Sequence, residues 1–135
     1  MKYTVAIEVG DEDTAYGVTV PDIPGCFSAG DSFEEALENA KEAINGHLEI
    51  LAEDGELPPK ASAPNQLING KEYAGYIWAV VEIDIEPFLG KSQKVNVTLP
   101  NLTLHQIDEV VSKNPAYKSR SHFLQVASMH ELQCA

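Results

Sequence analysis

The 135-residue chain lacks a long apolar run, a secretory leader and a set of paired cysteines. No stretch approaches the roughly 20 apolar residues that a membrane-spanning helix needs. The amino-terminal residues alternate between polar and apolar and do not form the apolar core of a leader peptide. The two cysteines, Cys26 and Cys134, lie far apart in the sequence, so they do not form a disulfide framework. We therefore expect a cytoplasmic protein with reduced thiols and no membrane partner.

Patterns that bind metals or nucleotides are also missing from the sequence. The four histidines show no ligand spacing of the HxxxH kind, and no glycine-rich loop has the form that cradles phosphate groups. The sequence accordingly predicts neither a metal site nor a cofactor.

Positive charge is scarce in the first two thirds of the chain. Residues 1–90 hold 4 Lys against 18 Asp and Glu, a net charge of −14, whereas residues 91–135 hold 5 Lys and Arg against 3 acidic residues, a net charge of +2. An acidic first part should repel nucleic acids and attract basic proteins. The asymmetry therefore predicts that the two parts of the chain have different partners.

The apolar pattern predicts a β-β-β-α-β order for the first part of the chain. Alternation over residues 3–20 indicates a hairpin, and residues 26–29 form a third short strand. Ser32 with Glu35 is a capping box, which opens an amphipathic helix. The apolar run over residues 76–85 predicts a fourth strand in the centre of the sheet. The fold class is therefore α+β, an antiparallel sheet with one main helix.

Two kinds of catalytic site need to be weighed in this first part. Cys26 follows a Pro-Gly turn, as an active-site thiol could, but no base stands beside it in the sequence. Two-metal nucleases need carboxylates that converge on a site about 4 Å across, and Glu82, Asp84 and Glu86 share one face of a strand, with Glu8 on the first strand. We expect a buried structural thiol and solvated carboxylates, hence no enzyme, and keep a nuclease or hydrolase as the alternative hypothesis.

The sequence divides into a domain over residues 1–86, a linker over residues 87–92 and a second domain over residues 93–135. The strand pattern breaks at the linker and the charge changes sign there. The second domain shows one short strand and two short helices, with a capping box at Thr103 and a cap at Ser119. These elements are too few to bury a core without a partner.

The short strand of the second domain is expected to pair with the same strand of a second copy. A lone strand leaves its backbone groups unpaired on both edges. Antiparallel pairing of two chains satisfies these groups and produces a two-stranded ribbon over four helices, so we expect a homodimer, with a tetramer of two such dimers as a further alternative. The side chains that would face the helices and form the dimer core are Val95, Val97 and Leu99.

The few positive charges of the second domain lie where a DNA surface would be. A two-stranded ribbon fits the major groove, where Lys and Asn read base edges. The outward side chains of the ribbon are Lys94, Asn96 and Thr98. Free amides at a helix start bind phosphate, and the polar residues at the start of the last helix are Ser119, Arg120 and Ser121. The sequence therefore predicts double-stranded DNA as a partner.

Residues 93–132 resemble the ribbon-helix-helix (Arc/MetJ-like) repressors. The resemblance rests on the strand KVNVTLP, on the helix that follows it and on the SRSxFL start of the next helix. It implies that Lys94, Asn96 and Thr98 occupy the base-reading positions of that family.

Residues 22–43, with the sequence DIPGCFSAGDSFEEALENAKEA, and the hairpin before them resemble the HicB antitoxins. The resemblance implies a partial ribonuclease-H-like sheet and helix that binds a small basic HicA toxin, an mRNA-cleaving ribonuclease whose active site the antitoxin covers. It also implies an antitoxin that represses its own operon at an operator, and hence joins the nucleoid when repressing. The toxin-binding residues are unknown at this point. As an alternative, a ribbon-helix-helix regulator could sense a small ligand with the loop at residues 57–74.

Overall fold

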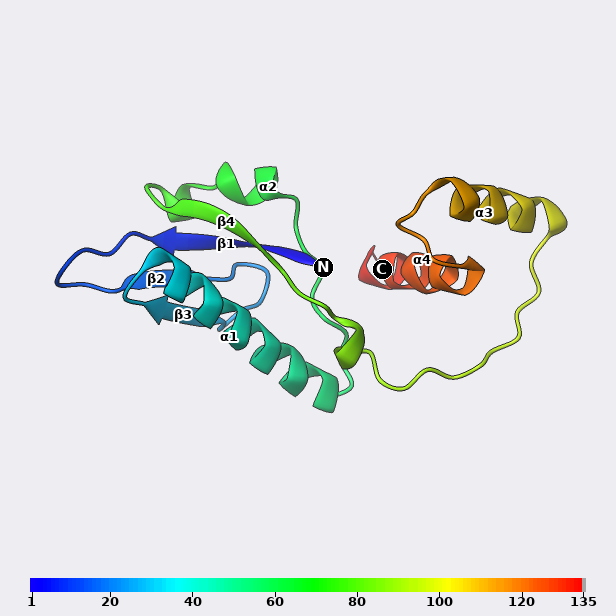
Figure 1. Cartoon of the computed structure of the whole chain (residues 1–135), viewed down its shortest axis with the longest axis horizontal. Coiled ribbons are helices and arrows are strands. Elements are labelled where there is room, and N and C mark those ends of the chain that lie inside the picture. Colours follow the sequence, from blue (N-terminus) through cyan, green and yellow to red (C-terminus); the bar gives the residue numbers. More distant parts are fainter. Residues whose placement is uncertain (135) are drawn as a thin grey trace. The chain divides into compact units, whose positions relative to one another are not determined.

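The computed structural model describes residues 1–134, which form two compact units, Met1–Lys91 and a second unit that begins at Ser92. Figure 1 shows the main elements of the first unit, which are β1 (Lys2–Glu8), β2 (Tyr16–Thr19), β3 (Phe27–Gly30), α1 (Phe33–Glu53) and β4 (Ile77–Glu82). The predicted β-β-β-α-β order and the α+β class are thus confirmed.

The four strands form one antiparallel sheet in the order β3-β2-β1-β4. β1 lies inside the sheet and is buried at five successive residues, whereas β4 pairs only with β1 and lies at an edge. The prediction that the fourth strand is central was therefore wrong. Tyr3 faces Val81 across the β1–β4 pair and Ala6 faces Trp78, so the apolar residues of β4 belong to both faces of the sheet. Of the β4 residues only Val81 is buried, whereas Ile77 is 46% and Val80 52% exposed, so the apolar run does not mark a strand with neighbours on both sides.

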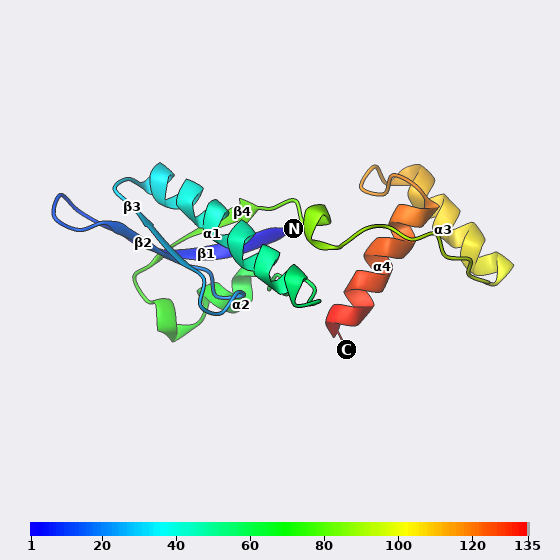
Figure 2. The same cartoon turned by 90° about the horizontal axis from the view of Figure 1, so that it is seen from below.

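Helix α1 covers one face of the sheet (Figure 2). It begins as predicted at the cap Ser32, whose Oγ accepts a hydrogen bond from the amide of Glu35 at 3.1 Å. Its buried stripe consists of Ala36, Ala40, Ile44 and Leu48. This stripe packs against β1 and β2 residues on the same side of the sheet and forms the core of the unit.

A segment with two short helices, α2 (Pro64–Ile68) and η1 (Lys71–Tyr73), lies on the opposite face of the sheet (Figure 2). Its first part is tied to the turn before β3, because the amide and Oγ of Ser62 donate to the Asp22 carboxylate at 2.7 and 2.6 Å. In addition, the hydroxyl of buried Tyr3 donates to the carbonyl of Pro59 at 2.7 Å. The region expected to be a loop is therefore fixed to the sheet.

The first unit ends with the short helix η2 (Glu86–Phe88), and Phe88 packs against the core of that unit. The compact unit thus extends through most of the segment 87–92. Asp84 accepts a hydrogen bond from the amide of Glu86 at 3.1 Å, which starts the turn.

The second unit contains α3 (Asn101–Lys113) and α4 (Arg120–Cys134), and residues 92–100 before them form neither a helix nor a strand within the single chain (Figure 1). α3 begins at Asn101 with Pro100 at the cap position, so the capping box predicted at Thr103 was wrong. The fixed φ of proline suits a helix start, so α3 begins two residues before Thr103, at Asn101. The cap predicted at Ser119 is confirmed, because its Oγ accepts from the amide of His122 at 3.1 Å.

Replacing Gly30 with Ala should destabilise the first unit by about 1–3 kcal/mol, the usual range for overpacking. A Cβ at Gly30 would lie 2.4 Å from the backbone nitrogen of Ala36, so either β3 or the first turn of α1 must move. Urea unfolding followed by the fluorescence of Trp78, the single tryptophan, measures the change.

The matched control is Gly46→Ala inside α1, where an added Cβ meets nothing within 4 Å. This change should stabilise the helix by about 0.5–1 kcal/mol, because glycine loses more conformational freedom than alanine on folding. Equal effects of the two substitutions would contradict the close packing of β3 on α1.

Candidate functional site

In the segment at residues 92–100, both alternating sets of side chains, the predicted base readers and the predicted dimer core, are largely exposed. Lys94, Asn96 and Thr98, the residues predicted to read bases, are exposed. Of the residues predicted to form the dimer core, Val95 is 72% exposed, Val97 is 64% exposed, and Leu99 is half-buried. The segment is not helical, and a strand needs a neighbour to complete its hydrogen bonds.

The helices of the second unit also leave most of their apolar side chains open. Within residues 92–134, Ile107 alone is buried, although α3 and α4 contact each other. Leu102 is 79% exposed, and Val110, Val126 and Leu132 are exposed as well. With one buried residue in two helices, the second unit buries little apolar surface by itself, and apolar side chains exposed in this number are typical of an interaction surface.

The start of α4 brings Ser119, Arg120 and Ser121 together, as predicted, but Arg120 has a partner that the sequence did not reveal. Its Nε and Nη2 donate to the two carboxylate oxygens of Asp108 on α3 at 3.0 and 2.8 Å. This hydrogen bonding lowers the pKa of Asp108 and raises that of Arg120. This ion pair joins α3 to α4. Because both side chains are exposed, either of them can instead pair with another charged group.

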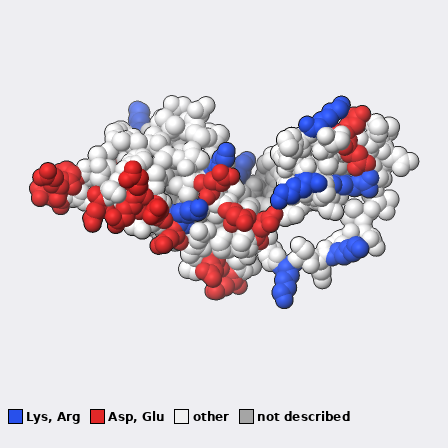
Figure 3. All heavy atoms as spheres, in the orientation of Figure 1, with Lys and Arg blue, Asp and Glu red and all other residues white. Residues whose placement is uncertain are grey.

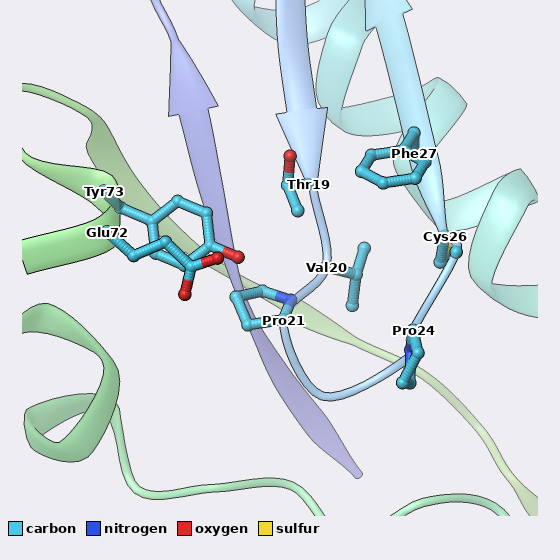
Figure 4. A pocket seen from close by; sticks show the side chains of 9 residues that line it. Thr19, Val20, Pro21, Pro24, Cys26, Phe27, Glu72 and Tyr73 are labelled. Carbon is cyan, nitrogen blue, oxygen red and sulfur yellow. The ribbon is translucent and has the colours of Figure 1, made fainter. Parts of the chain in front are cut away.

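The PDIPGC turn of the first unit lines a shallow pocket of about 280 Å³ (Figure 4). One wall comes from the end of β2, the turn and the start of β3, and consists of Thr19, Val20, Pro21, Pro24, Gly25, Cys26 and Phe27. The facing wall consists of Glu72 and Tyr73 from η1. Two segments that are about 50 residues apart in the sequence therefore meet across one hollow.

An aromatic cluster holds the η1 wall of this pocket in place. The ring of Tyr73 makes edge contacts with Tyr76 and Trp78, at centroid distances of 5.5 and 5.4 Å. Burial, and then the charges of Glu72 and Tyr76, raise the pKa of Tyr73. Three aromatic residues within six positions were the available signal for this cluster, but the sequence placed Tyr73 in the loop at residues 57–74 and Tyr76 and Trp78 in the predicted fourth strand.

The charges of the two units differ in sign, as their composition requires. Figure 3 shows Asp and Glu spread over the first unit, along the β1–β2 loop and the face of α1, while the second unit shows Lys and Arg together with a few acidic residues and the segment before it shows only Lys and Arg. The net charges of −14 for residues 1–90 and +2 for residues 91–135 are therefore displayed on the surface.

Residues 3–128 match the family model described as the HicB-like antitoxin of bacterial toxin-antitoxin systems. The chain belongs to the HicB-like antitoxin family. It is 45% identical, over all of both chains, to a 14.9 kDa protein from the rep-hol intergenic region of Haemophilus phage HP1.

Solved structures of HicB antitoxins resemble this HicB-like chain in fold. The Burkholderia pseudomallei antitoxin HicB is 40% identical with a TM-score of 0.77, and the match covers 98% of each chain. The N-terminal domain of the same protein is 42% identical with a TM-score of 0.55, and it matches 62% of this chain and 99% of its own. A chain in the HicA3–HicB3 toxin-antitoxin complex is 36% identical with a TM-score of 0.52, again over 62% of this chain and 99% of its own.

The residues considered for catalysis in this HicB-like protein are a buried thiol and a set of exposed carboxylates. Cys26 is buried, and burial raises the pKa of its thiol, which disfavours the thiolate that a nucleophile needs. Glu82, Asp84 and Glu86 are exposed. In the described part, residues 1–134, no three His, Cys, Asp or Glu side chains are grouped so that they could hold a metal. Residues 1–134 likewise contain no helix with the length and apolarity to cross a membrane.

In the native protein, Ellman's reagent should label Cys134, which is exposed, and leave Cys26 unlabelled until the chain is unfolded in urea. Burial and a raised pKa both keep the Cys26 thiol protonated and inaccessible. The matched control is Cys134→Ser, which should show almost no labelling before unfolding. Rapid labelling of that variant in its native state would mean that Cys26 is a reactive thiol.

Proposed function

We propose that this HicB-like protein is the antitoxin of a HicA/HicB pair, which neutralises a HicA-like mRNA-cleaving toxin through Met1–Lys91. The observation that carries the proposal is the match to a chain of the HicA3–HicB3 complex over 62% of this chain, a share equal in size to the one that the N-terminal domain of the Burkholderia antitoxin matches. The net charge of −14 in residues 1–90 suits a basic, RNA-binding partner. In this proposal, the antitoxin neutralises the toxin by covering its active site and catalyses no reaction itself.

The fold of the first unit fits this role in the proposal. The antiparallel β3-β2-β1 order followed by α1 supports the partial ribonuclease-H-like fold that the family resemblance implies. The carboxylates Glu82, Asp84 and Glu86 are exposed side chains at and beyond the end of an edge strand. In the proposal they contribute acidic surface.

The second unit is proposed to dimerise and to bind operator DNA as a ribbon-helix-helix domain. Val95 and Val97 are exposed, as are apolar side chains of α3 and α4. A second copy of the chain carries the same residues and would bury these side chains against its own. Pairing of the two segments at residues 94–99 would satisfy their backbone groups and bury both valine rows. Lys94, Asn96 and Thr98 would then point from the ribbon into the major groove, so that the complete antitoxin represses its own operon.

The start of α4 is the proposed phosphate contact in that DNA complex. Ser119 caps the helix and Ser121 is exposed beside it. Arg120 is exposed in its pair with Asp108, and a phosphate could replace Asp108 as its partner, since Arg binds both groups through the same fork. These contacts would set the position of the ribbon on DNA without reading sequence.

A fragment of residues 1–91 should bind the cognate HicA-like toxin of the proposed pair about as tightly as the full-length protein does, and should lose DNA binding. The fragment keeps Phe88 and the whole core, whereas it lacks the proposed ribbon. Calorimetry measures binding to the toxin. Gel shifts with the DNA upstream of the proposed operon measure DNA binding. A gel shift by the fragment would show that the division of labour is wrong.

Two neighbouring substitutions should separate dimerisation from base reading. Val97→Asp places a charge in the proposed dimer core, so the protein should sediment as a monomer at micromolar concentration and lose DNA binding. Asn96→Ala should remain a dimer and bind operator DNA about tenfold or more weakly, the loss typical of a base contact. A Val97→Asp protein that remains dimeric through this unit would contradict the ribbon.

A further inference from the structure

The pocket of the first unit has walls of two different kinds. The wall on the PDIPGC turn is rigid, because backbone hydrogen bonds join Val20 to Cys26 and Ile23 to Val20, and Ile23 and Cys26 are buried. At its rim stands Phe27, which is 66% exposed on the edge strand β3. The opposite wall is Glu72 with Tyr73, and Figure 4 shows these two side chains lying together across from the turn.

Phe27 has no packing role that explains its place. It shares the sheet face away from α1 with its register partner Thr19, and it remains mostly open there. A large aromatic ring left open at the rim of a pocket is the kind of residue that supplies binding energy in protein interfaces.

The chemistry of the hollow suits a cation. None of the nine lining residues is basic, and Glu72 is the one acidic member. Aromatic faces attract cations through their quadrupole, and Tyr73 and Phe27 supply rings on opposite sides. A guanidinium can stack on a ring and also donate two hydrogen bonds to a carboxylate, which an ammonium cannot do in one plane. The surrounding unit has 4 Lys against 18 acidic residues in residues 1–90, so a cationic partner is favoured over an anionic one.

We propose that this pocket receives an arginine side chain of the toxin, held between Phe27 and Tyr73 and paired with Glu72. The inference deepens the proposed antitoxin function, since it names a contact point within the first unit and the side chain that enters it. The PDIPGC turn then has two roles, with its inward residues in the core and its outward residues at the binding surface.

The first experiment tests the pocket without the toxin. The full-length protein is titrated with the peptide acetyl-Gly-Arg-Gly-amide and with the matched citrulline peptide, which has the same shape but no charge, and NMR records the ring signals of Phe27, Tyr73 and Trp78. The arginine peptide should shift these signals with millimolar, saturable binding, and the citrulline peptide should bind about threefold or more weakly. Equal shifts for both peptides, or no shifts in the pocket, would overturn the proposal.

Charge-matched variants complete this titration. Glu72→Gln should weaken the arginine peptide to the level of the citrulline peptide, because it removes the carboxylate and keeps the side-chain shape. Glu49→Gln removes the same charge from an exposed position on α1, on the other face of the sheet, and should leave the binding unchanged. If both variants weaken the peptide equally, general acidity and not the pocket attracts the arginine, and the proposal fails.

The second experiment uses the cognate HicA-like toxin of the proposed pair. Glu72→Gln and Phe27→Ala should each lower the affinity for it about tenfold or more, because the first removes the carboxylate that pairs with the arginine and the second removes the ring that stacks on it. Glu49→Gln should stay within about twofold of the unchanged protein, as a screened surface charge does. Unfolding monitored by Trp78 checks that all variants are folded.

The outcomes separate this inference from the proposed function. If the unchanged protein binds the toxin and Glu72→Gln binds it equally well, the pocket assignment is wrong and the antitoxin function stands. If the unchanged protein does not bind the toxin, the antitoxin function fails, and the assignment of a toxin arginine to the pocket fails with it, whatever the peptide does. A shift of the pocket signals with protein concentration alone would place a second copy of this chain in the hollow and also overturn the proposal.

Discussion

The close approach of β3 to the first turn of α1 is the constraint on which the first unit depends. At Gly30 there is no room for a side chain, because the backbone of Ala36 occupies the place of a Cβ. Helix α1 can therefore lie low enough on the sheet for its Ala-rich stripe to bury Tyr3, Val5 and Ile7. The same approach fixes the end of β3 at Gly30, and with it the position of the short strand that carries Phe27. Packing on one face of the sheet thus determines which groups are displayed on the other.

Most of the first unit could be predicted from the sequence, since periodicity and caps are local signals. Ser32, Glu35 and the alternation around Val5 specified the helix and the hairpin without reference to the rest of the chain. Strand order is not local, and so β4 was misplaced: an apolar run does not tell whether a strand has a neighbour on one side or on both. The loop at residues 57–74 was expected as a possible wall of a ligand site, and Glu72 and Tyr73 do line a pocket. The facing wall was beyond prediction, because Glu72 meets the PDIPGC turn only after η1 folds back over the sheet.

The second unit contains a segment whose sequence predicts a strand, although the single chain forms no strand there. Alternation over Val95, Val97 and Leu99 is typical of a strand, yet residues 92–100 form no strand within one copy. In the proposed ribbon the one neighbouring strand would come from a second chain. The pair between Arg120 and Asp108 is the opposite case. It joins residues 12 apart on different helices, so no helical spacing rule could signal it. Ser119, by contrast, was found because a cap acts within its own turn.

Electrostatics links the two proposed activities of the chain. Residues 1–90 carry a net charge of −14, and any DNA duplex held by the second unit meets this charge in the same molecule. Like charges in this arrangement oppose DNA binding, within the distance that salt allows. A basic partner bound to the first unit removes part of the repulsion without touching the DNA surface. If both proposed activities hold, this chain should bind DNA more weakly alone than with its basic partner bound, even though the two proposed binding surfaces share no residue.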